Sequence, residues 1–222
     1  MAKTVKKRDY PNDYASVTQA LGVLRKIGLE IWYKNNTAEF CDSASKKGKI
    51  VGSLIHEVIE NYILHQQITI TTYYSEDVNN ALRSFILFRT EHPEFDLELT
   101  EVPMTSEIWK CNGTMDAPLK RNGMLIVGDW KTGECKVGTP KEKDKPPIYD
   151  EYKAQVAAYA KFYNEIYKTD INSAIIVAFA KDKIAYNLYE MGQPELDDYF
   201  NGMFVPALTI LNHQKKYKEI NK

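Results

Sequence analysis

The sequence predicts an α/β fold, because helical and strand patterns alternate along its 222 residues. Three observations lead to this prediction. An Asn122-Gly123 pair between two short apolar runs is typical of a tight β-hairpin. An alanine-rich stretch over 151–167 has the composition and spacing of a strong helix. Two apolar runs then follow, over 173–180 and 184–189, and we expect them to form antiparallel strands.

Helical patterns also lie on both sides of this core. We expect residues 1–13 to form a flexible basic arm and residues 14–222 to form a single domain. Ser16 is a good helix-starting residue. Further helices are predicted over 16–35, either continuous or broken near Gly28, and over 51–66, 77–90 and 194–217.

Two segments between these helices are predicted differently. Residues 41–50 are polar and are expected to form a loop. Residues 97–108 alternate like a strand, and Pro103 indicates that this strand lies at an edge or carries a bulge.

The register of the hairpin places two acidic residues face to face. If Asn122 and Gly123 form the loop, Asp116 lies opposite Asp129, with their Cβ atoms roughly 5 Å apart. Strand alternation puts Lys131 on the same face as Asp129, opposite Thr114. The apolar residues of the hairpin point the other way, into a core: Met115, Ala117, Leu119, Ile126 and Trp130.

A divalent metal ion would explain two facing carboxylates. They repel each other unless a cation lies between them, and oxygen ligands select Mg²⁺ or Mn²⁺. Lys131 would then offset charge that develops on a bound phosphate. A solvated hairpin tip with an Asp–Lys ion pair explains the same residues without any function. The hairpin alone leaves both interpretations open.

Composition and charge limit which kinds of protein this sequence can be. The formal net charge of −1 gives no general attraction to polyanions, so any binding of nucleic acid depends on local clusters. Lys136 and Lys141, in a long loop over 133–150, are candidates for phosphate contacts, although a solvated linker has the same composition. Three scattered cysteines argue against a zinc site or a disulfide framework. With no run apolar enough to cross a membrane, we expect a cytoplasmic protein.

Five motifs occur in an order that resembles a known family. They are His56-x-x-x-Glu60, Glu101, Gly113-Thr-Met-Asp116, Asp129-Trp-Lys131-Thr-Gly and Gln155-x-x-x-Tyr159. Together they resemble the RecB-like branch of the PD-(D/E)xK nuclease superfamily. The residues of these motifs are most similar to those of the mitochondrial genome maintenance exonuclease and its phage relatives. The resemblance implies a restriction-endonuclease-like core, in which helices flank a mixed central β-sheet, with helical additions at both ends.

The resemblance also implies a metal site. His56, Asp116 and Asp129 match metal ligands for one or two Mg²⁺ or Mn²⁺ ions, together with the backbone carbonyl of Trp130. Lys131 matches the catalytic lysine. Glu101 matches an acidic position before the hairpin, and Glu60 a less constant, supporting one. An iron–sulphur cluster is not expected, because relatives that hold one use four cysteines.

The helix motif and the helix start imply contacts with DNA. Gln155 and Tyr159 match residues that hold the DNA and shape the site, and Ser16 lies in the matching helix start. Tyr152, Tyr159 and Trp109 are candidates for stacking on unpaired bases.

The resemblance therefore implies a metal-dependent DNA exonuclease. We expect it to act on single-stranded ends in recombination, repair or replication, and a protein of those pathways is an expected partner. Two alternatives remain: a non-cleaving or partner-activated DNA-binding module on the same fold, and a hydrolase of another phosphoester.

Overall fold

The computed structural model describes residues 10–11, 13–65, 68, 70–135 and 144–220. Most of the expected basic arm, and both Lys136 and Lys141, lie outside these described residues.

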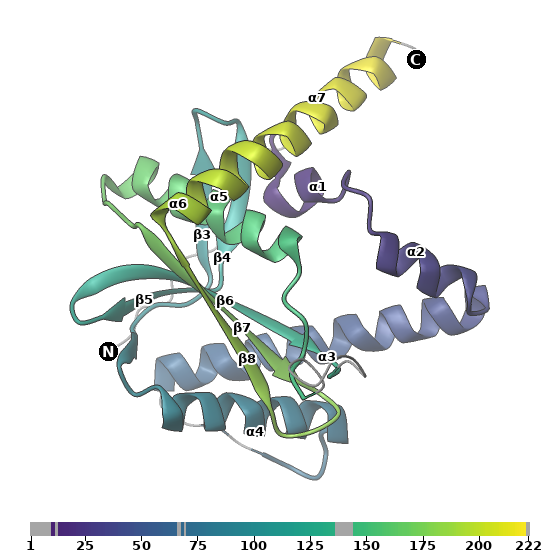
Figure 1. The fold of residues 1–222 in the computed structure, drawn as a ribbon, viewed down its shortest axis with the longest axis vertical. Coiled ribbons are helices and arrows are strands. Elements are labelled where there is room, and N and C mark those ends of the chain that lie inside the picture. Colours follow the sequence, from purple (N-terminus) through teal and green to yellow (C-terminus); the bar gives the residue numbers. More distant parts are fainter. Residues whose placement is uncertain (1–9, 12, 66–67, 69, 136–143, 221–222) are drawn as a thin grey trace.

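Two mixed β-sheets form the centre of the molecule (Figure 1). The larger sheet has the order β2-β5-β6-β7-β8, in which only β6 and β7 run parallel. Its strands are β2 (Phe95–Leu97), β5 (Ala117–Arg121), β6 (Met124–Gly133), β7 (Ser173–Ala180) and β8 (Tyr186–Gly192). The smaller sheet has the order β1-β4-β3, from β1 (Ala15–Ser16), β4 (Cys111–Met115) and β3 (Val102–Ser106).

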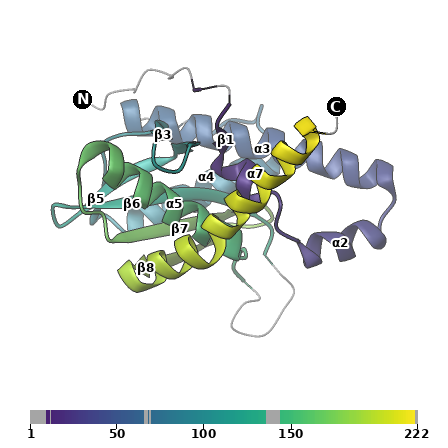
Figure 2. The ribbon, with the colours of Figure 1, turned by 90° about the horizontal axis from the view of Figure 1, so that it is seen from above.

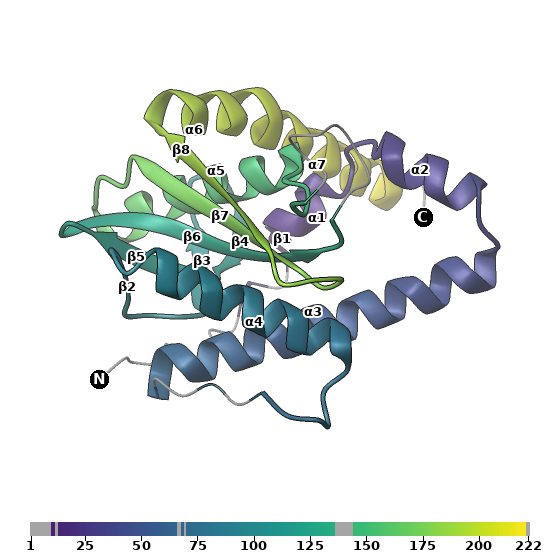
Figure 3. The same cartoon turned by 60° about the horizontal axis from the view of Figure 1, so that its bottom comes forward.

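Helices cover both faces of the larger sheet (Figures 1 and 3). On one face lie α3 (Ala38–His65) and α4 (Glu76–Glu91). On the other lie α5 (Asp150–Tyr167), α6 (Gln193–Tyr199), a π-helical turn (Phe200–Phe204) and α7 (Val205–Ile220). This arrangement confirms the predicted fold class of a mixed sheet flanked by helices. No helix among the described residues is long and apolar enough to span a membrane.

Strand alternation in β7 connects the two layers. Ile175, Val177 and Phe179 pack against α3 and α4, whereas Ala174 and Ile176 pack against α5 and the C-terminal helices. Burial on both faces explains why this strand reads as one continuous apolar run.

The hairpin has the predicted register but not the predicted length. Ala117 pairs with Gly128 and Arg121 with Met124, around a turn in which Asn122 and Gly123 both have positive φ. The ladder ends at Ala117, because the residues that precede Asp116 form β4, which belongs to the smaller sheet. The prediction that Lys131 lies opposite Thr114 is therefore wrong.

Three other predicted boundaries are also wrong. Residues 41–50 belong to α3 instead of a loop. The first helix is two helices, α1 (Val17–Leu21) and α2 (Ile27–Lys34), separated after Leu21 and not near Gly28. The strand expected over 97–108 is split into β2 and β3, and Glu101 lies between them. Pro103 does lie on an edge strand, as predicted.

Candidate active site

Three side chains from distant parts of the chain converge beside the break in the hairpin. His56 comes from the middle of α3, Glu101 precedes β3, and Asp116 joins β4 to β5. His56 Nδ1 lies 3.6 Å from a carboxylate oxygen of Asp116 and 3.9 Å from one of Glu101. The three ligand atoms all lie within 4.8 Å of one another. One imidazole and two carboxylates at this spacing can bind a divalent cation.

The second nitrogen of His56 fixes the orientation of the ring. Nε2 lies 3.1 Å from the Trp130 carbonyl oxygen, and because a carbonyl only accepts, Nε2 is the donor. The other nitrogen, Nδ1, is thereby directed at the carboxylates. The Trp130 carbonyl, which the resemblance implies as a metal ligand, accepts this hydrogen bond from His56 in the structure.

The acidic neighbours of His56 change its proton affinity. Burial alone lowers the pKa of His56, but the negative charge of Asp116 and hydrogen bonding to Glu101 outweigh it and raise the pKa to about 9. The imidazole is therefore positively charged at neutral pH when no metal is bound. A metal ion at Nδ1 would replace this proton.

Glu101 has a strained backbone. Its φ of +49° lies in the left-handed region, which non-glycine residues rarely adopt. Its N–H donates to the carbonyl of Asp116 at 2.9 Å, and this bond joins the two carboxylate-bearing segments. Strain of this kind often accompanies functional sites.

Asp129 and Lys131 form a buried ion pair next to this cluster. Both lie on β6, and the lysine ammonium is 2.6 Å from a carboxylate oxygen of Asp129. Asp129 is 0% exposed, and among the described residues neither of its carboxylate oxygens has a hydrogen-bond partner of good geometry. Burial raises the pKa of Asp129 to about 6, although Lys131 opposes the shift.

A divalent cation fits this group of residues. Burial of a carboxylate is costly even beside a lysine, and coordination to a metal would satisfy its oxygens. Asp116 connects both parts, since its second oxygen accepts from the Trp130 N–H at 2.7 Å while the first faces His56. Among the described residues, Glu101 belongs with His56 and Asp116 to the group of close ligand atoms, whereas Asp129 lies outside that group and pairs with Lys131.

Helix α5 forms one wall of the site. Gln155 donates to the Tyr159 hydroxyl at 2.8 Å, which confirms that these residues contact each other one turn apart. Tyr159 is only 2% exposed, so its ring face is not available for stacking on a base. Tyr152 is different, because its partly buried ring lies 5.2 Å from the Lys131 ammonium. Trp109 packs edge-on against Phe200.

Gly113 explains how Tyr159 comes so close to β4. A Cβ atom at this position would lie 2.7 Å from a ring carbon of Tyr159, a distance that real Cβ atoms do not reach. The glycine of the Gly-Thr-Met-Asp motif is therefore required by packing next to the site.

A pocket of about 530 Å³ lies in front of these residues. His56, Glu101 and Asp116 line it together with Gln155 and Tyr159. Ser16 also lines it, but its hydroxyl accepts from the Gln19 N–H and so starts α1. Tyr10, Pro11 and Tyr14 also line it. Tyr10 has no signal in the sequence, because no local pattern reports a contact between residues 103 positions apart.

Glu60 lies at the edge of a second hollow. This hollow of about 390 Å³ contains Glu57, Glu60, Glu101 and His56. Burial, and then the charges of Glu101 and Glu57, raise the pKa of Glu60. The structure thus places Glu60 beside the cluster but outside its three ligand atoms.

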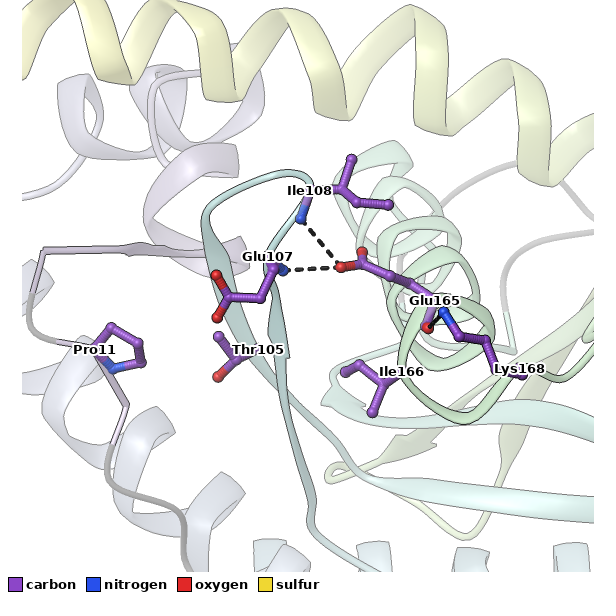
Figure 4. Close-up of a pocket in the computed structure, with 7 residues that line it drawn as sticks. All are labelled: Pro11, Thr105, Glu107, Ile108, Glu165, Ile166 and Lys168. Carbon is purple, nitrogen blue, oxygen red and sulfur yellow. Dashed lines mark hydrogen bonds between the residues drawn. The ribbon is translucent and has the colours of Figure 1, made fainter.

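A third hollow, of about 510 Å³, has a structural explanation (Figure 4). Glu165 of α5 accepts from the backbone N–H groups of Glu107 and Ile108, and from the Ser106 hydroxyl at 2.5 Å. These bonds fix the turn between β3 and β4 against α5. The side chains around this hollow do not form a metal-binding group among the described residues.

Comparisons with known proteins add little to this geometry. No protein-family model and no curated protein matches the chain. Among solved structures, it is similar to the crystal structure of SSO0001, with 19% identity and a TM-score of 0.37 over 64% of this chain and 62% of that one. It is also similar to a "putative exonuclease" from Eubacterium rectale, with 12% identity and a TM-score of 0.49 over 74% of this chain and 68% of that one. The chain thus spans less than two thirds of the first of these proteins.

Proposed function

We propose that this protein is a Mg²⁺- or Mn²⁺-dependent deoxyribonuclease of the RecB-like PD-(D/E)xK type. In this proposal, residues 14–222 form one nuclease domain that removes nucleotides from single-stranded DNA ends during recombination, repair or replication. One observation carries the proposal: the His56–Glu101–Asp116 cluster lies beside a buried Asp129–Lys131 pair. The alternative of an exposed, solvated ion pair does not fit, because Asp129 is 0% exposed.

The acidic residues and His56 would hold the cation. Asp116, Glu101 and His56 supply the three close ligand atoms, and Asp129 supplies a further carboxylate at the same end of the hairpin. The cation would polarise a phosphoryl oxygen and lower the pKa of a bound water.

Lys131 supplies a fixed positive charge. Burial lowers the pKa of Lys131, but the carboxylates of Asp129 and Asp116 outweigh it and raise the pKa, so the amine stays charged at neutral pH. A held ammonium group stabilises negative charge that develops on a phosphate during hydrolysis and helps to orient the attacking water. Its position over the Tyr152 ring limits its movement.

An aromatic side chain next to Lys131 suits an unpaired strand. Tyr152 is partly exposed beside Lys131 and can stack on a base whatever its identity. Tyr159 acts differently in this proposal, by shaping the wall through its bond with Gln155. Burial raises the pKa of Tyr159 well above its usual value, so its hydroxyl remains protonated.

Cleavage of end-labelled oligonucleotides tests this function. Single- and double-stranded substrates, labelled at either end, would be incubated with Mn²⁺ or with EDTA. We expect stepwise shortening of the single strand with Mn²⁺ alone, and the label that survives longer gives the polarity. Tight DNA binding by the folded protein without cleavage in any divalent metal would favour the non-cleaving module instead.

The affinity for Mn²⁺ is expected to depend on pH. Because the pKa of His56 is about 9 without metal, Mn²⁺ must displace a proton below that pH. We expect the affinity to rise with pH between about 6.5 and 8.5, by at most roughly tenfold per pH unit. Calorimetric titrations at several pH values measure this slope. A wild-type slope no steeper than that of His56→Gln would contradict the assignment of His56.

A further inference from the structure

Helix α2 and the first part of α3 form a projection with many exposed apolar side chains. We define the projection as α2 together with residues 38–50 of α3, a segment that extends beyond the sheets in perpendicular views (Figures 1 and 2). No residue of α2 is buried. The large apolar side chains exposed on the projection are those of Ile27, Leu29, Ile31, Tyr33, Phe40 and Ile50. Exposed apolar side chains that gather on one segment are typical of a surface that binds another protein.

One face of α3 in the projection is covered by the rest of the chain. Cys41 is 0% exposed, and Ala44 and Gly48, three and then four residues further along, are partly buried. This spacing places all three on one face of the helix. Lys47, next to this face, pairs with Asp77 of α4 at 2.7 Å.

The opposite face of α3 carries a stripe of exposed charges. We define the stripe as Glu39, Asp42, Lys46 and Lys49, which follow one another at intervals of three, four and three residues. Since two residues span about 200° of a helix, the middle of the stripe lies opposite Ala44. All four charged side chains are exposed, and none forms an ion pair with another residue in the described part of the chain.

The charges of the stripe are symmetrical about Ala44, with the sign reversed. Glu39 lies five residues before Ala44, and Lys49 lies five residues after it. Asp42 and Lys46 lie two residues before and two residues after it. If a second copy of the stripe lies antiparallel to the first, with the two-fold axis level with Ala44, each acidic side chain faces a lysine of the other copy. A parallel arrangement would instead bring equal charges together.

The residues around the stripe allow two helices to approach each other. Ser43 and Ser45 flank its centre, so no large side chain keeps two helices apart there. Ile50 is 68% exposed, and the antiparallel register places it against Ala38 of the second copy. This contact removes apolar surface from water at each end of the stripe.

We propose that the stripe is a docking surface for a second copy of this chain, and that the protein forms a two-fold symmetric dimer through antiparallel α3 helices. The proposal does not depend on the nuclease function, because the stripe lies outside the His56–Glu101–Asp116 cluster. Exposed ion pairs contribute little individually and are screened by salt, so the dimer is weak and forms best at low ionic strength.

Reversal of the charges in both directions tests the dimer. Lys46→Glu combined with Lys49→Glu makes the stripe wholly negative, and Glu39→Lys combined with Asp42→Lys makes it wholly positive. Gel filtration with light scattering, at low ionic strength and over a range of protein concentrations, measures the mass of each variant and of their equimolar mixture. Circular dichroism should show that both variants are folded.

The control reverses two basic charges outside the projection. Arg83→Glu combined with Lys216→Glu changes the net charge by the same amount as the wholly negative variant, at exposed positions of α4 and α7. We expect this control to associate like the wild type.

We expect the wild type to reach the mass of a dimer as its concentration rises. Each reversed variant alone should associate at least about thirtyfold more weakly, because every substitution acts twice across the axis and replaces attraction by repulsion. The mixture of the two variants should dimerise, since opposite charges face each other again. A wild type that stays monomeric at its highest soluble concentration would overturn the proposal. Reversed variants that dimerise like the wild type, or a mixture that stays monomeric, would overturn it as well.

Discussion

Replacing Asp129 by Asn is expected to abolish metal-dependent cleavage of DNA, with a loss in rate of at least about a thousandfold, near the upper end for removal of one electrostatic group from a site. Asp129 is fully buried and pairs with Lys131 at 2.6 Å, so the substitution removes a negative charge and leaves the lysine without its counter-ion. The rate of cleavage of labelled single-stranded DNA in Mn²⁺ measures the effect.

A matched substitution separates this effect from unfolding. Asp170→Asn changes the same functional group at an exposed position, and we expect a normal rate. Circular dichroism should show that both variants are folded. A folded Asp129→Asn protein that cleaves at the wild-type rate would refute the assignment of the site.

Replacing Trp130 by Ala is expected to lower the free energy of unfolding by about 3–5 kcal/mol, the usual cost of removing a large buried aromatic ring. Trp130 is 2% exposed and contacts Phe85, Phe88 and Phe179 between the larger sheet and the helices α3 and α4. Urea denaturation of the wild type and the variant measures the difference.

Two further variants test the reason for this loss. Trp130→Phe keeps most of the ring and removes an indole N–H that has no partner in the described structure, so we expect a smaller loss than for Ala. Tyr73→Ala removes an exposed ring and should change the free energy by less than about 0.5 kcal/mol. If Trp130→Ala lowers the free energy of unfolding as little as Tyr73→Ala does, Trp130 does not stabilise the packing of this layer.

Local chemistry made several elements predictable. The Asn122-Gly123 turn fixes the hairpin register because both residues adopt positive φ. The helix over 151–167 and the strand over 173–180 bury strongly apolar faces, so their patterns are clear. The same register correctly placed Asp129 and Lys131 on one face, as their ion pair confirms.

Other elements lacked a pattern that the sequence could show. The first part of α3 projects from the sheets beside α2, which has no buried residue (Figures 1 and 3). A helix that packs against few other residues needs no continuous apolar face, so the polar residues 41–50 resemble a loop. The break at Asp116 depends on pairing of β4 with β3 and with the two-residue strand β1. Such long-range pairing is invisible to local alternation.

The candidate site was predictable only in part. The hairpin register by itself suggested Asp116, Asp129 and Lys131, whereas His56, Glu101 and Glu60 were suggested only by the resemblance to a nuclease family. The closeness of His56 to Asp116 results from the packing of α3 beside β6, which no local pattern reports. The contact of Tyr10 with Gly113 and the close approach of Gly113 to Tyr159 came from the structure alone.

The most direct test of the account is a calorimetric titration of the wild-type protein and Asp116→Asn with Mn²⁺. Asp116 contacts both His56 and the Trp130 N–H, so its carboxylate is central to the proposed metal site. We predict saturable binding to the wild type, and binding to Asp116→Asn that is weaker by at least roughly 100-fold, the upper end of what the loss of a supporting residue alone costs. Asp170→Asn should bind normally. No binding by the folded wild type, or equal binding by Asp116→Asn, would contradict a metal site formed by these residues.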